Sequence, residues 1–239
     1  MPDPRDWWIV GASEGLGRAL ASRLDADRAS LVLSARNAER LAGIAGGLRD
    51  ALAVPMDVTD QASVMQAVEA AGPVEGVIYC VGQYEPMSAR DWDTESAIAM
   101  TEANYIGALR VLGGVLPTMR ARDSGRIVLV GSIAGYRGLP GAIGYGASKA
   151  ALMHLAENLR FDLRGTGIRV QIVNPGFIDT RLTRKNAFSM PSIMSPDIAA
   201  GHVVRAIRNG RFSASFPFPF ATLFRFSRCL PQWLFDKFF

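Results

Sequence analysis

The sequence is poor in the residues from which disulfide frameworks and metal sites are built. Only two of its 239 residues are cysteines, Cys80 and Cys229, and they form no Cys-x-x-Cys pair. Its two histidines, His154 and His202, lie in helical patterns with no evident aspartate partner, so we interpret them as ordinary helix residues. Neither a disulfide framework nor a metal site is indicated, and a reducing, cytoplasmic compartment fits this cysteine usage.

Long apolar runs and clusters of like charge are missing as well. The first apolar run, residues 7–10, is too short for a signal peptide or a membrane span, so we expect no export. The 26 basic and 22 acidic residues leave a net charge of +4 that is spread along the chain, which suits an anionic ligand and gives little support to a nucleic-acid partner. With 49% hydrophobic residues over 239 positions, we predict a single domain, residues 1–239, around one sizeable core.

A glycine-rich turn follows the first apolar run. Residues 11–17 read Gly-Ala-Ser-Glu-Gly-Leu-Gly, and a helical pattern of leucines begins at Leu16. Strand, glycine turn and helix is the order of a phosphate cradle, because glycines let the backbone approach a pyrophosphate and the free amides of the helix start favour its charge. The Gly-x-x-x-Gly-x-Gly spacing matches neither the Gly-x-Gly-x-x-Gly form nor a Walker loop. Taken alone, the turn leaves cofactor binding and a simple turn equally open.

An arginine stands where a dinucleotide fold places the residue that reads the ribose. The second apolar run, residues 31–33, is followed by Ser-Ala-Arg36, at about the right distance past the glycine turn. An acid here would bind the 2′-hydroxyl of NAD, whereas Arg36 can pair with the 2′-phosphate of NADP. We therefore predict that NADP(H) is preferred over NAD(H). Glu14 in the glycine turn and a simple surface role for Arg36 argue against this prediction.

Apolar, strand-like runs alternate with helical patterns along most of the chain. The runs cover residues 7–10, 31–33, 51–55, 74–81, 126–130 and 168–173. This alternation, with strands apolar on both faces, predicts an α/β fold in which helices cover both sides of a parallel sheet. Several polar or glycine residues fall just past a strand and should line one crevice at the carboxyl edge of the sheet. They are Gly11, Arg36, Asp57, Gly82 and Ser132.

A long helix is predicted over residues 92–120, interrupted at Gly107 and at Gly113-Gly114. Asn104 lies inside it. Because an amide buried in a helix needs a hydrogen-bond partner, a capping or packing role is the simplest interpretation of Asn104.

The stretch from 132 to 149 holds Ser132, Tyr145 and Lys149. Tyr145 and Lys149 are four residues apart in a helical pattern, so both should project from one face of a helix. A fixed ammonium favours the phenolate and moves the pKa of a tyrosine toward neutrality, and a serine after a strand can hold a substrate oxygen. A packed tyrosine, a solvated lysine and a turn serine are the simpler alternatives. A hydrolase elbow is not indicated, because Val130 occupies the first glycine position of Gly-x-Ser-x-Gly around Ser132.

Together these motifs resemble the classical short-chain dehydrogenase/reductase family over about residues 7–216. The resemblance is carried, in order, by the glycine turn, Asp57-Val58, Asn104-Tyr105-Ile106-Gly107, Ser132, Tyr145-Gly146-Ala147-Ser148-Lys149 and Pro175-Gly176. It implies a Rossmann-like, doubly wound sheet of about seven parallel strands, of which residues 211–216 form the last. It also implies a catalytic tetrad of Asn104, Ser132, Tyr145 and Lys149.

The resemblance implies a role for each of these residues. Tyr145 would exchange a proton with the substrate oxygen that Ser132 holds and polarises. Lys149 would lower the pKa of Tyr145 and bind the nicotinamide ribose, while Asn104 would anchor a water that relays protons to Lys149. Asp57 and Val58 would contact the adenine, and Ile178 and Thr180 the carboxamide. The full set of cofactor-binding residues implied is Gly11, Ser13, Gly15, Leu16, Gly17, Arg36, Asp57, Val58, Gly82, Asn104, Tyr145, Lys149, Pro175, Gly176, Ile178 and Thr180.

Two positions depart from the family pattern. Val10 stands where a threonine often precedes the first glycine, and Tyr79-Cys80-Val81-Gly82 replaces Asn-Asn-Ala-Gly after the fourth strand. Both departures bear on local hydrogen bonding around the cofactor rather than on the chemistry.

The end of the chain is apolar and aromatic. Residues 181–196 form a Met-rich loop where the family places its substrate lid, which suggests an apolar substrate or, equally, gap filling in the core. From Phe212 onward lie nine of the twelve phenylalanines. For the tail, residues 217–239, packing against the body or a second subunit is favoured over covering the substrate or touching a membrane surface. Its apolar residues recur at helical spacing, although Pro231 should break a helix: Phe220, Leu223, Phe226, Leu230, Leu234 and Phe238.

The sequence thus predicts an NADP-dependent oxidoreductase that transfers hydride between its cofactor and a carbonyl or secondary alcohol substrate, in a homodimer or homotetramer. The alternative from another class is a non-catalytic nucleotide-sensing or scaffold protein that keeps the same fold. A membrane-surface lipid enzyme, differing only in the role of the tail, is the third.

Overall fold

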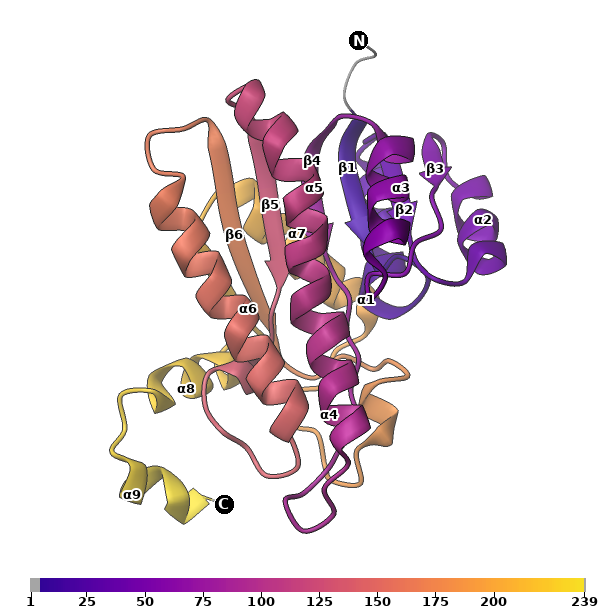
Figure 1. Cartoon of the computed structure of the whole chain (residues 1–239). Coiled ribbons are helices and arrows are strands. Elements are labelled where there is room, and N and C mark those ends of the chain that lie inside the picture. The colour runs from indigo at the N-terminus through magenta and orange to yellow at the C-terminus, as the bar shows by residue number, and fades with distance from the viewer. Residues whose placement is uncertain (1–4, 239) are drawn as a thin grey trace.

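The apolar runs of the sequence form a sheet of seven parallel strands in the computed structural model, which describes residues 5–238 (Figure 1). Residues 1–4 and 239 of the predicted domain lie outside the described part. The spatial order is β3-β2-β1-β4-β5-β6-β7, and every neighbouring pair is parallel. This confirms the predicted Rossmann-like fold. The strands are β1 (Arg5–Val10), β2 (Leu31–Ser34), β3 (Ala51–Ala53), β4 (Val74–Tyr79), β5 (Gly125–Val130), β6 (Ile168–Pro175) and β7 (Ser213–Phe216).

Three strands are shorter than the runs that predicted them, and the other four extend one or two residues beyond theirs. The run 51–55 forms a strand only over Ala51–Ala53, although the amides of Val54 and Met56 still donate to the carbonyls of Leu33 at 2.8 Å and Ala35 at 3.1 Å. The run 74–81 ends as a strand at Tyr79, after which the chain turns into the crevice, and the last strand begins at Ser213 rather than at residue 211.

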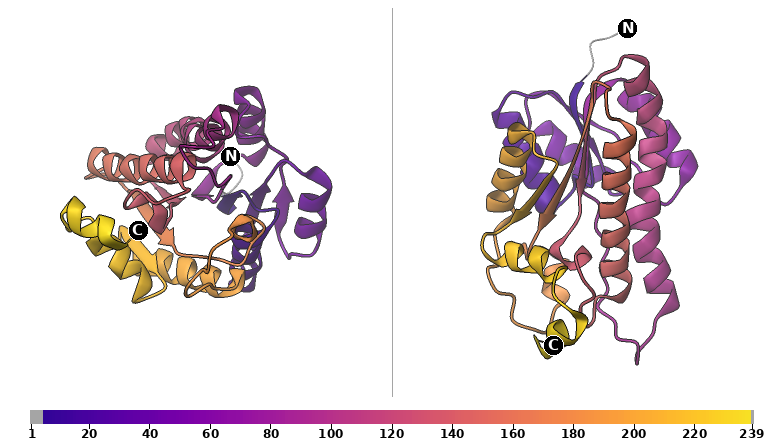
Figure 2. Two further views of the ribbon diagram at one scale, coloured as in Figure 1. Left: turned by 90° about the horizontal axis from the view of Figure 1, so that it is seen from below. Right: turned by 90° about the vertical axis from the view of Figure 1, so that its left-hand side faces the viewer.

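Helices cover both faces of the sheet, and the strands supply apolar side chains to each (Figure 2). In β1, Trp7 and Ile9 face one core while Trp8 and Val10 face the other, as the two-residue period of a strand requires. The first core is closed by α1 (Gly15–Ala26), α2 (Ala38–Gly46) and α7 (Pro196–Asn209). The second is closed by α3 (Gln61–Ala71), α5 (Gly107–Ala121) and α6 (Ile143–Asp162).

The long helix expected over residues 92–120 is interrupted elsewhere than at its paired glycines. It consists of α4 (Thr94–Thr101), the π-helical segment η1 (Glu102–Ile106) and α5, so the irregular turn contains Asn104 and precedes Gly107. Gly114 remains helical and allows close packing, because a Cβ there would lie 2.5 Å from Cγ2 of Val68 on α3. The glycine therefore serves contact between helices and not a break in one.

The aromatic tail folds back beside the lower end of α6, as both views show (Figures 1 and 2). It forms α8 (Phe220–Ser227), α9 (Gln232–Phe235) and the short η4 (Asp236–Phe238), with the break at Pro231 that the sequence indicated. The apolar stripe is not the buried face expected. Ala221 is buried, whereas Leu223 is 66% and Phe226 is 65% exposed. The side chain of Phe238, the last member of that stripe, lies outside the described residues.

Within residues 5–238, no helix has the length and apolar character needed to cross a membrane.

Candidate active site

A cavity of about 960 Å³ opens at the carboxyl edge of the sheet, across the point where the strand order reverses between β1 and β4. Ligands of doubly wound sheets bind at such a reversal. One end of the cavity lies on the glycine loop, and the other lies under the segment after β6 and the aromatic tail. The structure brings all but one of the residues singled out from the sequence to its wall: Gly11, Ser13, Gly15, Leu16, Gly17, Arg36, Asp57, Val58, Gly82, Ser132, Tyr145, Lys149, Pro175, Gly176, Ile178 and Thr180.

The glycine loop takes a backbone path that larger residues cannot follow. Gly11 has φ +95° and a Cβ there would lie 3.0 Å from the backbone of Cys80, while a Cβ on Gly17 would lie 2.0 Å from the carbonyl oxygen of Gly11. Helix α1 then begins after Glu14 with no side-chain cap, whereas Asn37 and Asp60 cap α2 and α3. The first amides of α1 are therefore left for a ligand, which suits a phosphate group.

Basic side chains gather beside the end of β2. Arg36 is exposed on the cavity wall and, among the described residues, has no ion-pair partner. Arg40, one turn into α2, also lines the cavity and lies 3.4 Å from Glu14. Glu14 pairs more closely with Arg181 of the segment after β6, at 2.7 Å. Glu14, the acid that argued against a 2′-phosphate site, is thus paired with Arg40 and Arg181. Arg36 therefore remains available to bind an anion.

Asp57 and Val58 close the side of the cavity beyond β3. The carboxylate of Asp57 accepts hydrogen bonds from the amide of Thr59 at 2.9 Å and from its hydroxyl at 2.8 Å. Val58 is buried, and its carbonyl accepts a hydrogen bond from Arg110 at 3.2 Å. Both residues are fixed by the protein itself, so this wall is a preformed surface.

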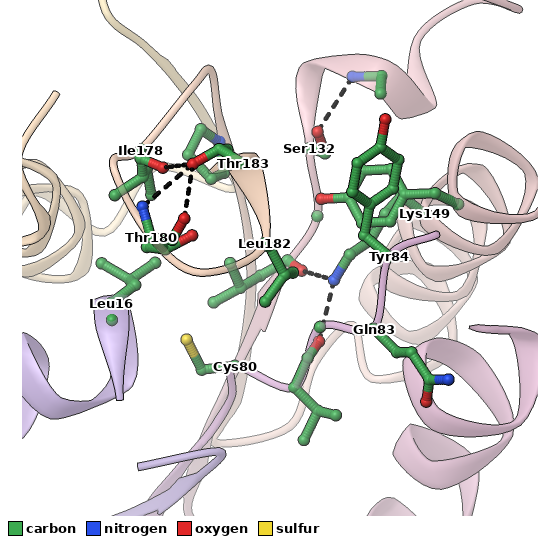
Figure 3. A pocket seen from close by; sticks show the side chains of 18 of the residues that line it. Leu16, Cys80, Gln83, Tyr84, Ser132, Lys149, Ile178, Thr180, Leu182 and Thr183 are labelled. Carbon is green, nitrogen blue, oxygen red and sulfur yellow. Dashed lines mark hydrogen bonds between the residues drawn. The ribbon is translucent and has the colours of Figure 1, made fainter. Parts of the chain in front are cut away.

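Ser132, Tyr145 and Lys149 meet at the middle of the cavity. Ser132 follows β5 and caps η2 (Ile133–Gly135), accepting a hydrogen bond from the amide of Ala134 at 3.1 Å. Tyr145 and Lys149 both come from the first two turns of α6. The Lys149 ammonium lies 5.9 Å from the centre of the Tyr145 ring and donates to the carbonyls of Val81 at 3.1 Å and Val130 at 2.9 Å (Figure 3).

Burial shifts the pKa values of both Tyr145 and Lys149. Burial raises the pKa of Tyr145 above its ordinary value, and the Ser132 hydroxyl beside it acts in the opposite direction. Burial also lowers the pKa of Lys149 to about 8. Burial is thus the dominant cause of the raised tyrosine pKa, and the Ser132 hydroxyl offsets part of it.

Asn104 is the predicted residue that does not line the cavity. Its side chain is fully buried in η1, where Oδ1 accepts from the amide of Gln83 at 2.7 Å. Nδ2 donates to the carbonyl of Gln83 at 2.9 Å and to the hydroxyl of Ser148 at 3.0 Å. The amide therefore braces the loop after β4 against the helix that carries Tyr145, one layer behind the cavity wall.

Tyr79 is the first of the residues that depart from Asn-Asn-Ala-Gly after β4. Its hydroxyl donates a hydrogen bond to the carbonyl of Ala103 in η1. A Cβ on Gly107 would lie 2.4 Å from the same hydroxyl, so the glycine gives the tyrosine its room. The Tyr79 hydroxyl thus ties the end of β4 to the π-helical segment that holds Asn104. Cys80 follows, and burial raises the pKa of its thiol to about 12.

The segment after β6 is held in place by a threonine. The Thr183 hydroxyl donates to the carbonyl of Ile178 at 2.6 Å and accepts from the amide of Thr180 at 3.0 Å (Figure 3). The amide of Gly176 donates to the carbonyl of Phe216 at 2.7 Å, which joins this segment to the end of β7. The turn that begins at Pro175 is therefore a defined wall of the cavity.

The far end of the cavity holds residues that the sequence did not single out. Tyr84 packs edge-on against Tyr145 with ring centres 5.1 Å apart, and its hydroxyl donates to Asn186 at 2.7 Å. No motif marks Tyr84, which follows the predicted Gly82 by two residues. Arg40 could have been found from the sequence, because it is a second arginine only four residues after Arg36.

Comparisons with known proteins agree with this geometry. Residues 7–189 match the family model described as short chain dehydrogenase. The chain is 35% identical over 236 residues to an uncharacterised oxidoreductase of Myxococcus xanthus, covering 95% of this chain and 93% of that one. It is 31% identical to an uncharacterised oxidoreductase of Mycobacterium tuberculosis, covering 96% and 95%.

Solved structures give the same result. A short chain dehydrogenase from Burkholderia cenocepacia in complex with NADP superimposes with a TM-score of 0.87 at 25% identity, covering 98% of this chain and 97% of that one. A short-chain dehydrogenase from Streptomyces avermitilis gives a TM-score of 0.85 at 25% identity, covering 95% and 93%. The recognition made from the motifs is confirmed: the chain belongs to the short-chain dehydrogenase family of oxidoreductases.

Proposed function

We propose that this protein is an NADP(H)-dependent oxidoreductase that interconverts a carbonyl compound and a secondary alcohol, with an apolar substrate. The observation that carries the proposal is the meeting of Ser132, Tyr145 and Lys149 on the wall of a cavity whose other end is the glycine loop. A hydrogen-bond donor, a proton-exchanging phenol and an ammonium are what a carbonyl oxygen needs when its charge changes.

The cavity suits a phosphorylated dinucleotide. The uncapped start of α1 would hold the pyrophosphate, and Arg36 with Arg40 would pair with the 2′-phosphate. Asp57 and Val58 would border the adenine, and Ile178 and Thr180 would fix the carboxamide. The bound nicotinamide supplies or accepts the hydride. The Burkholderia cenocepacia relative, whose structure holds NADP, supports the same choice of cofactor.

The chain's own residues would manage the proton at the substrate oxygen. Ser132 would donate a hydrogen bond to that oxygen and hold it beside the phenol of Tyr145. Because burial raises the pKa of Tyr145, the phenol is protonated at neutral pH and is ready to give its proton to a carbonyl oxygen during reduction. Lys149 would bind the nicotinamide ribose and assist loss of the phenol proton in the opposite direction.

Asn104 would act as a positioning residue. Through Gln83 it fixes the loop after β4, and through Ser148, whose hydroxyl donates to the carbonyl of Tyr145 at 2.8 Å, it fixes the first turn of α6. This contact places the side chain behind the reacting groups rather than among them.

Replacing Tyr145 tests the proposal. Tyr145→Phe removes the exchangeable proton and keeps the ring, so kcat with NADPH should fall at least about a hundredfold while NADPH still binds. Tyr105→Phe is the control, because Tyr105 lies in η1 and not on the cavity wall. The candidate substrates are a panel of ketones, acyl derivatives, sugars and steroids. Turnover of each is measured as the rate of NADPH consumption.

The same experiment separates the proposal from a sensor or scaffold. Unchanged turnover in Tyr145→Phe would exclude this mechanism. NADPH binding without turnover of any carbonyl or alcohol by the unmodified protein would favour the non-catalytic alternative.

A further inference from the structure

Aromatic side chains from three distant segments meet at the far end of the cavity. Phe177 follows β6. Its ring centre lies 5.9 Å from Phe188 of the Met-rich loop at residues 181–196, called the lid segment below, and 6.0 Å from Phe220 of the tail. Phe220 in turn lies 5.1 Å from Phe224, one turn further along α8. Aromatic pairs at these separations attract one another and pack with little side-chain freedom. The tail is therefore part of the same apolar surface as the substrate end of the cavity.

The tail contributes directly to the cavity wall. Helix α8 lies against η2, the short helix that Ser132 caps, and against β7. The tail residues that line the cavity, together with the Ser132 and Tyr145 side chains, are Phe220, Leu223, Phe224, Ser227, Leu230 and Phe235. The one polar side chain among them, Ser227, donates its hydroxyl to the carbonyl of Phe224 at 2.7 Å.

Within residues 5–238, no charged side chain of the tail lines the cavity. Among the described residues, the charged side chains on the wall are Glu14, Arg36, Arg40, Asp57, Lys149 and Arg181. Glu14 belongs to the glycine loop, Arg36 and Asp57 follow β2 and β3, Arg40 lies in α2, and Arg181 pairs with Glu14. The charged side chain of Arg137 lies behind the tail's part of the wall, and its terminal nitrogens donate to the carbonyls of Ser227 and Leu230 and to Gln232. A carboxylate or phosphate lying against the tail would therefore lose its hydration without a free charged partner on that part of the wall.

Arg137 fastens the tail to the loop after η2. It donates to the carbonyls of Ser227 and Leu230, and through its other terminal nitrogen to the Gln232 side chain at 2.7 Å. Its guanidinium also lies 4.4 Å from the centre of the Phe235 ring. The Arg137 side chain thus joins α8 and α9 to the loop after η2. These contacts hold the tail in a defined position against the cavity.

From these contacts we propose that the C-terminal tail is the outer wall of the substrate site and that it selects uncharged carbonyl substrates with a long or bulky apolar group. The inference rests on the proposed function, because it assigns the substrate class of the same site. Leu223, Phe220 and Phe224 are specificity-determining residues, and Arg137 is a positioning residue that holds them.

Helix α8 offers a matched pair of variants. Leu223 lines the cavity but is 66% exposed, so Leu223→Ala removes part of the wall at little expense to the fold. Phe226, on the same helix, is 65% exposed and does not line the cavity, so Phe226→Ala is the control. Both variants would first be checked for unchanged melting temperature.

The assay is NADPH-dependent reduction of methyl ketones of rising chain length, from methyl ethyl to methyl nonyl ketone. We expect kcat/KM to rise about fourfold for each methylene that the wall covers. Leu223→Ala should lower kcat/KM for methyl nonyl ketone about fivefold and leave methyl ethyl ketone unchanged, while Phe226→Ala changes neither. The keto acid of equal length, with a carboxylate at the far end, should be a much poorer substrate.

The inference would be overturned by equal kcat/KM along the series, by equal effects of the two variants, or by equal use of the keto acid. Any of these leaves the proposed function intact, provided that ketones are reduced at all. If none is reduced, the proposed function is wrong, and calorimetric titration of methyl nonyl ketone into the protein with NADP⁺ still tests the wall. Tighter binding of the ketone to the unmodified protein than to Leu223→Ala supports the inference that the tail forms the outer wall of the substrate site. Equal binding to both proteins, or no binding, contradicts that inference.

Discussion

Lys149 is a buried ammonium, and its effect on stability can be measured by removing it. Its side chain is 2% exposed, and burial lowers its pKa from 10.5 to about 8, with Cys80 acting in the opposite direction. No carboxylate among residues 5–238 forms an ion pair with it, and its hydrogen bonds go to the carbonyls of Val81 and Val130. Folding therefore places the ammonium where it is less stable than in water.

The direction of the pH dependence follows from where the proton is bound. At pH 7 both the folded and the unfolded chain carry it, and the full penalty of burial opposes folding. Between pH 8 and 10.5 the folded chain loses a proton that the unfolded chain still binds, so the Lys149 contribution to stability becomes less unfavourable as the pH rises. We expect the free energy of unfolding of the wild type, relative to Lys149→Met, to increase by about 2.5 kcal/mol from pH 7 to pH 10.

The assay is urea unfolding of the wild type and of Lys149→Met at both pH values. Loss of the hydrogen bonds to Val81 and Val130 costs the variant about 1 kcal/mol each, but this term does not depend on pH and leaves the difference between the two conditions intact. Groups that titrate in both proteins cancel. Lys237→Met, at an exposed position of η4, is the control and should show no such change. A Lys149→Met difference that stays constant between pH 7 and pH 10 would refute the reasoning.

Three further predictions concern the cofactor. Arg36→Ala should weaken NADPH binding about tenfold or more and leave NADH binding unchanged in fluorescence titrations, because only NADPH carries the 2′-phosphate; a wild type that prefers NADH would contradict this. Gly17→Ala should abolish NADPH binding, because the added Cβ would lie 2.0 Å from the carbonyl oxygen of Gly11. Gly43→Ala is the control, because a Cβ there has no neighbour within 4 Å. This variant should bind NADPH normally and gain about 0.5–1 kcal/mol in stability. Glu14→Gln weakens the 2.7 Å ion pair with Arg181, which joins the lid segment to the glycine loop. NADPH should then dissociate several-fold faster in stopped-flow measurements, with the melting temperature nearly unchanged. An unchanged dissociation rate would show that this ion pair does not retain the cofactor.

The sheet could be predicted because its signals are local. In residues 7–10 every side chain is apolar, which is typical of a strand covered on both faces, and the glycine turn marks where that strand ends. For the long helix, the interruption predicted at Gly107 falls where the π-helical turn ends, whereas the one predicted at Gly113-Gly114 is absent. Gly113-Gly114 is the strongest local signal, yet Gly114 serves the approach of Val68, and the irregular turn falls at Asn104, whose partners come from the loop after β4 and from α6.

In the candidate site, too, local motifs could be predicted and long-range contacts could not. Motifs place Ser132, Tyr145 and Lys149 by spacing alone, and the structure brings them to one wall of the cavity. Arg137 has no motif, and its role follows only from contacts with residues ninety or more positions away. The protonation of Tyr145 was equally out of reach, because the pKa depends on how completely the phenol is desolvated, which no spacing of residues reports.

The polar groups behind the cavity point to positioning as the reason for their burial. Asn104 and Ser148 are buried and bonded to each other, and Asn174, also buried, donates to the Tyr136 hydroxyl at 3.0 Å while its Oδ1 finds no partner among the described residues. Apolar residues of similar volume would avoid these desolvation penalties, as they would at Lys149. A core selected for stability alone would not keep such a layer directly beneath the loops that carry Ser132 and the first turn of α6. Its presence there is explained if those loops must be held in one arrangement, which is what a site that exchanges a proton and a hydride with one substrate requires.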